Sequence, residues 1–316
     1  MCFIPFVSLS FKEANSHNFF YGNLNISSII VTLILYKFLQ EMGQKVKKLL
    51  IIGASGLVGK ALALQCKNEF DIYGTYYTSS TNLSEDKQFQ LNIQNAEQLK
   101  SILSHVDLDI VISCLHGDFE QLMAFHKRLV NELNNTSLVY FLSTTNVYDG
   151  ELSRHHNELD VPISKSEYGQ HKIQCEQMLQ QLLRDRAIII RIPGIWGKDS
   201  PRFNSLVKNL ETNEPIKAYQ NLECSFLSDV QLAEQLHFVL KNELRGTIHL
   251  TAEDKVIESQ FYEQLLKKLT SKNITIQYTD YQDPEKLYYF GLDSIRNDLP
   301  PTLKVNSKDL LTYLVE

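Results

Sequence analysis

The chain has 316 residues, 43% of them hydrophobic, and a formal net charge of −6 at pH 7. Such a composition is typical of a packed globular protein with one large or two small domains, and the acidic balance argues against a general nucleic-acid binder. The five cysteines are scattered and form no CxxC pair, which argues against a zinc site or a disulfide framework and favours the reducing cytoplasm.

Residues 1–46 precede any regular pattern. Their most apolar run, residues 29–36, ends at Lys37 and is shorter than the roughly 20 apolar residues that a membrane-spanning helix needs. The segment also lacks the basic start and the small-residue cleavage site of a signal peptide. We therefore expect residues 1–46 to be a dispensable extension, with Met42 as an alternative start. The other interpretation is an anchor on a membrane surface.

Beyond residue 47, strand-like and helix-like stretches alternate. Strands are expected near residues 49–52, 72–77, 89–91, 110–113, 139–142 and 187–192, and helices near 57–68, 96–103, 120–132 and 167–183. This alternation predicts an α/β fold, a Rossmann-type doubly wound parallel sheet in residues 47–197. Residues 198–316 form a different region, with helices expected near 204–210, 230–240 and 259–269 and short strands near 247–250 and 274–278.

The glycine-rich motif GASGLVG at residues 53–59 follows an apolar strand and precedes a helix. Gly53 permits a tight turn, Gly56 lets the backbone approach a pyrophosphate, and Gly59 lets the helix pack close to the strand. The amino end of the helix adds free N–H groups and the positive end of its dipole. The motif therefore predicts a dinucleotide site.

A second motif, YGQHK, places Tyr168 and Lys172 about one helical turn apart and so on one face of a helix. An ammonium group beside a phenol favours the phenolate, so we expect Lys172 to lower the pKa of Tyr168. Tyr168 could then act as a general acid or base near neutral pH. Upstream, the strand near 139–142 ends in STTNVYDG, whose hydroxyls can point at a bound carbonyl group.

Taken in order, these motifs resemble the extended short-chain dehydrogenase/reductases, and most closely their RmlD-like dTDP-4-dehydrorhamnose reductases. The matching pieces run from residue 47 to the C-terminus and are GASGLVG, DIVISC, STTNVYDG, NELDVP, YGQHK and RIPGIWG. The resemblance implies that residues 47–197 bind NAD(P) and that 198–316 are mainly a substrate-binding lobe, with segments that return to the core.

The implied reaction is reduction of a nucleotide-linked 4-keto sugar. Tyr168 is the proton donor, Lys172 holds the nicotinamide ribose, and Thr144 binds the carbonyl oxygen, with Ser143 as its neighbour. The implied cofactor-binding residues are Gly53, Ser55, Gly56, Leu57, Val58, Gly59, Thr78, Asn92, Ile93, Cys114, Leu115, Tyr168 and Lys172. The expected partners are a nucleotide sugar and, as an option, a second copy of the chain.

Several departures from the family leave alternatives open. No carboxylate follows the strand near 72–77 until Glu85, which favours NADP over NAD, although NAD remains possible. Asn92 replaces an aspartate that lies near the adenine in the family, and His116 is either a surface residue or part of the site wall. A dehydratase is disfavoured because Thr145 and Asn146 offer no carboxylate. A nucleotide-sugar epimerase remains open, as does a non-catalytic subunit like the regulatory subunit of methionine adenosyltransferase.

Overall fold

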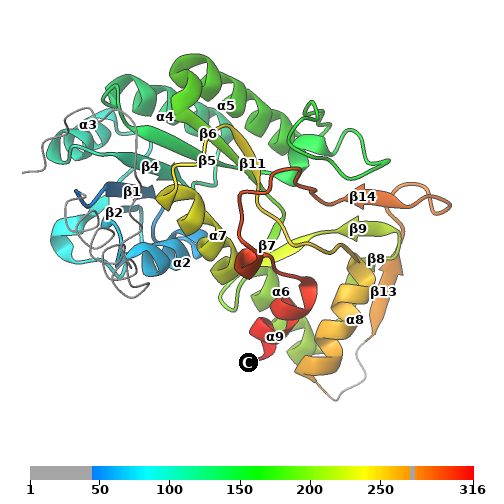
Figure 1. Ribbon diagram of the computed structural model, residues 1–316. Coiled ribbons are helices and arrows are strands. Elements are labelled where there is room, and N and C mark those ends of the chain that lie inside the picture. The colour runs from blue at the N-terminus through cyan, green and yellow to red at the C-terminus, as the bar shows by residue number, and fades with distance from the viewer. Residues whose placement is uncertain (1–44, 271–274) are drawn as a thin grey trace, which may run out of the picture. The chain divides into compact units, whose positions relative to one another are not determined.

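Figure 1 shows the computed structural model, which describes residues 45–270 and 275–316. Val46–Glu316 forms one compact unit. The expectation for residues 1–46 therefore lies outside the described residues, except for residues 45 and 46. The first residue of the strand expected at 274–278 also lies outside them. Within the described residues, no helix combines the length and hydrophobicity needed to cross a membrane.

The centre of the unit is a seven-stranded sheet whose neighbouring strands all run parallel, in the order β11-β6-β5-β4-β1-β2-β3. This confirms the predicted α/β fold. The inner strands β1, β4, β5 and β6 are almost wholly buried and rich in Ile, Leu and Val, as parallel strands covered on both faces must be. The bounds of the strands in this sheet are β1 (Lys48–Ile52), β2 (Asp71–Tyr76), β3 (Gln88–Gln90), β4 (Ile110–Ser113), β5 (Leu138–Thr144), β6 (Ala187–Ile192) and β11 (Thr247–His249).

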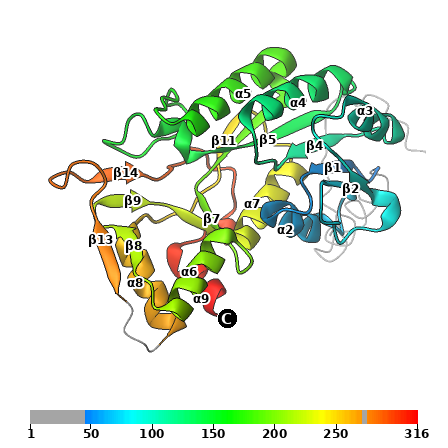
Figure 2. The same cartoon turned by 180° about the vertical axis from the view of Figure 1, so that it is seen from behind.

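Helices cover both faces of this sheet, as Figures 1 and 2 show. One face carries α2 (Leu57–Cys66) and α7 (Asp229–Lys241), which pack against each other. The other carries α3 (Ala96–His105), α4 (Phe119–Glu132) and α5 (Glu167–Leu183). The strand order reverses between β1 and β4, which places a crevice at the carboxyl ends of these two strands.

A smaller lobe lies beside the carboxyl edge of the sheet (Figure 1). Its core gathers aromatic and aliphatic side chains around Trp196, Phe226 and Phe261. Two segments of the region after residue 197 are not part of this lobe: β11 is a strand of the main sheet, and α7 packs against that sheet. The lobe contains β7 (Gly194–Trp196), α6 (Pro201–Thr212), β8 (Ile216–Tyr219), β9 (Leu222–Cys224), β10 (Phe226–Ser228), β12 (Val256–Ile257), α8 (Glu258–Leu269), β13 (Ile276–Thr279), β14 (Tyr288–Phe290) and α9 (Ser307–Val315).

Candidate active site

The loop between β1 and α2 is shaped by its backbone. Gly53 has φ of +86°, a conformation that other residues rarely adopt, and its N–H donates to Thr75 Oγ1 at 3.0 Å. A Cβ on Gly59 would lie 2.3 Å from the Gly53 carbonyl oxygen and 2.7 Å from the Ala54 Cα, so only glycine lets α2 approach this closely. These two glycines act as the sequence predicted, one in the turn and one in the helix contact.

Gly56 differs from both, because neither its backbone nor its packing requires glycine. Its φ is −78°, and a Cβ would meet nothing closer than the Gly53 oxygen at 3.4 Å. Gly56 is the N-cap of α2, no side chain caps this helix, and its first turn holds no acidic residue. The N–H groups at this helix end are therefore free to bind an anion, and the missing side chain leaves room for one. These features fit a pyrophosphate.

A cavity of about 610 Å³ lies over this loop, at the crevice between β1 and β4. Ten of the predicted cofactor-binding residues line it, namely Gly53, Ser55, Gly56, Leu57, Val58, Gly59, Asn92, Ile93, Cys114 and Leu115. Thr78, Tyr168 and Lys172 are not part of its wall. The cavity wall also includes three residues at the end of β2, Thr75, Tyr76 and Tyr77. These residues were not predicted from the sequence as part of the site; the sequence indicated only that no carboxylate follows this strand. Burial raises the pKa of the Cys114 thiol to about 12, so this wall group stays neutral.

The three predicted catalytic side chains meet at the carboxyl end of β5. Thr144 ends the strand, and its hydroxyl donates to Asn146 Oδ1 at 3.0 Å and accepts from the Asn146 N–H at 3.2 Å. Tyr168 lies in the first turn of α5, where the Thr144 hydroxyl is near enough to lower its pKa. The Lys172 ammonium, one turn later, lies 5.9 Å from the Tyr168 ring centroid and donates to the Leu142 carbonyl at 2.8 Å.

The expected lowering of the Tyr168 pKa is wrong for this structure. Burial raises that pKa, with only the Thr144 hydrogen bond opposing the shift. The reason is that Lys172 is nearly buried and directed at Leu142, and burial lowers its own pKa to about 8. Tyr168 is thus held in its protonated form, which suits a proton donor.

His116 lies between the cavity and Tyr168. It lines the cavity, and its ring centroid is 5.8 Å from that of Tyr168. Phe119 approaches the same ring at 6.1 Å and stacks on His171 at 4.8 Å. Of the two interpretations that the sequence left open, the structure favours His116 as part of the site wall, although its side chain is exposed.

Ser143 points away from Thr144, as alternate residues of a strand must. Its hydroxyl donates to Glu176, whose carboxylate also binds Arg191 at 2.7 Å. Both partners of this ion pair are buried. Ser143 therefore contributes to the packing of β5, β6 and α5, not to the surface that a substrate could reach.

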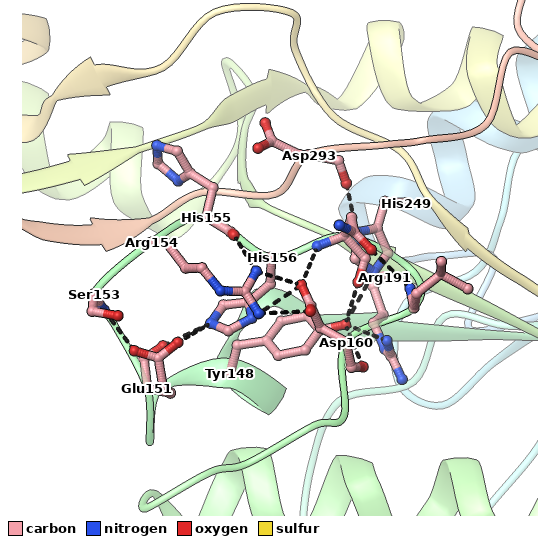
Figure 3. Close-up of polar contacts among 12 residues, drawn as sticks. Tyr148, Glu151, Ser153, Arg154, His155, His156, Asp160, Arg191, His249 and Asp293 are labelled. Atoms are coloured by element: carbon pink, nitrogen blue, oxygen red, sulfur yellow. Dashed lines mark hydrogen bonds and ion pairs between the residues drawn. The ribbon is translucent and has the colours of Figure 1, made fainter.

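Figure 3 shows the polar contacts that hold the loop after residue 150. The Tyr148 hydroxyl accepts from Arg191 Nη1 at 2.5 Å and lies 3.4 Å from His249 Nε2. The Tyr148 ring stacks on His156 at 4.4 Å, and Asp160 binds both terminal nitrogens of Arg154. Sequence reasoning noticed this stretch only as a family motif, because its partners come from β6 and β11.

Comparison with known proteins now adds to the geometry. The family description "RmlD substrate binding domain" matches residues 128–286, about half of the chain. The chain belongs to this family. It is 21% identical over 236 residues to the probable low-salt glycan biosynthesis reductase Agl14 of Haloferax volcanii, covering 68% of this chain and 78% of that protein.

Two further relatives differ in the roles that their names state. Methionine adenosyltransferase 2 subunit beta of Danio rerio is 22% identical over 166 residues, which is 48% of this chain and 49% of that protein. The dTDP-4-dehydrorhamnose reductase of Bacillus anthracis, solved with NADP, superposes with a TM-score of 0.68 and 17% identity over 86% of this chain and 98% of that one. At this identity the structural match shows the shared fold.

Proposed function

We propose that this protein is an NADP(H)-dependent reductase of a nucleotide-linked 4-keto sugar. The observation that carries the proposal is the meeting of Thr144, Tyr168 and Lys172 at the end of β5, with His116 linking this group to the cavity over the glycine loop. A hydroxyl, a protonated phenol and an ammonium group next to a dinucleotide-sized cavity are what carbonyl reduction requires.

The dinucleotide would lie along the carboxyl edge of the sheet. The free N–H groups at the start of α2 would hold its pyrophosphate, and Asn92 and Ile93 would lie at its adenosine end. Because Tyr76 and Tyr77 end β2 with no carboxylate, nothing there repels a 2′-phosphate, which favours NADP over NAD. When bound, the reduced nicotinamide supplies the hydride.

The side chains at the end of β5 handle the substrate oxygen. The Asn146 N–H fixes Thr144 Oγ1, and the Thr144 hydroxyl would turn its proton from Asn146 Oδ1 to donate it to a carbonyl oxygen. Tyr168 carries the proton that this oxygen takes up as negative charge develops on it. The Lys172 ammonium is held at the Leu142 carbonyl, and its remaining N–H groups are available to a ribose hydroxyl.

The direct test follows NADPH absorbance with a panel of nucleotide-linked 4-keto sugars, dTDP-linked ones first. We expect NADPH oxidation with at least one of them, and slower or no oxidation with NADH. Activity with NADH alone would contradict the cofactor assignment, and no activity with any of the sugars would contradict the reductase assignment.

A second candidate function rests on the relative named as a subunit of methionine adenosyltransferase. In this case the same fold would serve as a non-catalytic partner of another enzyme. Affinity purification of the full chain without added nucleotide sugar separates the two functions. A stoichiometric enzyme partner, together with no NADPH oxidation, would favour the regulatory role.

A further inference from the structure

We infer that Asp149 is a positioning residue, whose carboxylate holds the first turn of α5 and so keeps the Tyr168 hydroxyl at Thr144. The kinetic part of this inference rests on the proposed reductase function. Asp149 comes directly after the short 3-10 helix Thr145–Tyr148, and thus belongs to the same segment as Thr144.

The carboxylate of Asp149 gathers the three residues that lead into α5. Its Oδ1 accepts from the Ser164 hydroxyl at 2.8 Å, the Lys165 N–H at 2.6 Å and the Ser166 N–H at 3.3 Å. Its Oδ2 accepts from the Ser166 hydroxyl. A carboxylate can accept about four hydrogen bonds, so the bonds to this one segment use nearly all of the acceptor positions of Asp149.

Ser166 passes this restraint on to the helix. It is the N-cap of α5, and its hydroxyl accepts from the Gly169 N–H at 3.1 Å while it donates to Asp149. An N-cap bond fixes where a helix begins and how its first turn is oriented. Tyr168 lies in that turn, between the capping serine and the glycine whose N–H is capped.

A close backbone contact holds the same turn from its other side. A Cβ on Gly169 would lie 2.2 Å from the Asn146 carbonyl oxygen and 2.1 Å from Ser164 Oγ. The helix that carries Tyr168 therefore rests directly on the turn that carries Thr144. Asp149 bridges these two segments with charge-assisted hydrogen bonds, which are stronger than neutral ones. Its removal leaves the first turn of α5 free to shift while β5 stays in place.

The chain contains a matched control far from the site. Asp254 holds the start of α9 in a similar way, accepting from the Ser307 N–H at 2.8 Å and from its hydroxyl at 2.5 Å. Asp254→Ala thus removes a carboxylate that binds the first residue of another helix, without touching the candidate site. The conservative change Asp149→Asn keeps the acceptor oxygen and loses the charge.

The experiment compares Asp149→Ala, Asp149→Asn and Asp254→Ala in the full chain. For Asp149→Ala we expect kcat to fall by about 10²-fold, as for a misplacement of about 1 Å, while KM and NADPH affinity stay within about twofold. Asp149→Asn should recover part of the loss, and Asp254→Ala should leave kcat unchanged. Equal losses in the two alanine variants would overturn the inference.

A double-mutant cycle separates positioning from general destabilisation. If Asp149 acts through Tyr168, Asp149→Ala should lower kcat by less than about twofold further in a Tyr168→Phe background. A loss of the same size in both backgrounds would show that Asp149 acts on the fold as a whole and would overturn the inference.

Two readouts work even if the proposed reaction fails. Amide hydrogen exchange at residues 164–170 should become at least about tenfold faster in Asp149→Ala and stay unchanged in Asp254→Ala. An ultraviolet titration, taken as the difference from Tyr168→Phe, should show the raised pKa of Tyr168 moving down toward its usual value as the ring becomes exposed. Unchanged exchange together with an unchanged titration would overturn the inference, whatever the substrate is.

Discussion

The loop after β1 and the segment after β5 end parallel strands at the same edge of the sheet, yet they are held in shape by different means. The first depends on glycine conformation and backbone contacts, with Thr75 as the side chain that binds Gly53. The second depends on side chains from several elements, including Asp149, Glu176 and Arg191. A binding loop needs space and N–H groups, whereas a proton donor needs one atom held at one place.

The strongest test of the segment after β5 removes the Tyr168 hydroxyl. Tyr168→Phe should lower kcat by about 10²–10⁴-fold, the usual contribution of a general acid, and leave NADPH affinity unchanged. Tyr140→Phe is the matched control, because the buried Tyr140 hydroxyl has no hydrogen-bond partner among the described residues. Its loss should leave both activity and stability nearly unchanged. Full activity in Tyr168→Phe would keep the reaction and refute the proton donor.

Two alanine substitutions separate the role of the glycine loop in folding from its role in ligand binding. Gly59→Ala places a Cβ against the Gly53 and Ala54 backbone, and overpacking of this kind costs typically about 1–3 kcal/mol of unfolding free energy. Gly56→Ala meets no such contact and should cost less unfolding free energy than Gly59→Ala, only the preference of an N-cap for glycine over alanine, while it weakens NADP(H) binding. Urea unfolding and calorimetric titration measure the two effects. The opposite pattern would show that Gly56 serves the fold and not a ligand.

The difference between these regions decides what the sequence could predict. The parallel sheet and the loop at residues 53–59 were predictable because strand alternation and glycine spacing are local patterns. Tyr168 and Lys172 were found because they lie one turn apart. The bonds of Tyr148 to Arg191 and His249 were not, since their partners lie 43 and 101 residues further along the chain.

The direction of the Tyr168 pKa shift also could not be predicted from the sequence. The spacing placed an ammonium near the phenol, which is correct, but it could not show that Lys172 would be buried and bound to Leu142. Burial of both groups opposes the charge effect that the motif suggested. The positioning role that we assign to Asp149 had no local signal either, because its partners follow 15 to 17 residues later.

The last expected effect is on stability at low pH. The loop at residues 53–59 holds no titratable side chain, whereas several buried histidines adjoin β5 and the segment after it, and burial strongly lowers the pKa of two of them. His126 packs on Phe141 and His249 on Tyr148. Burial lowers the pKa of His126 to about 3 and that of His249 to about 4. Both values lie below the roughly 6.5 of a histidine in the unfolded chain, so between these limits the unfolded chain binds more protons.

Stability should therefore fall as the pH drops below about 6.5, with each histidine contributing up to about 1.4 kcal/mol per pH unit. Urea unfolding at pH 7, 6 and 5 measures the slope. His126→Gln should reduce it, because a glutamine cannot take up the proton that His126 accepts on unfolding. A flat profile between pH 7 and 5, or greater stability at pH 5, would show that these two rings are not held neutral and buried. The side chains around β5 would then be more open to water than the packing of His126 against Ser113 and Phe141 implies.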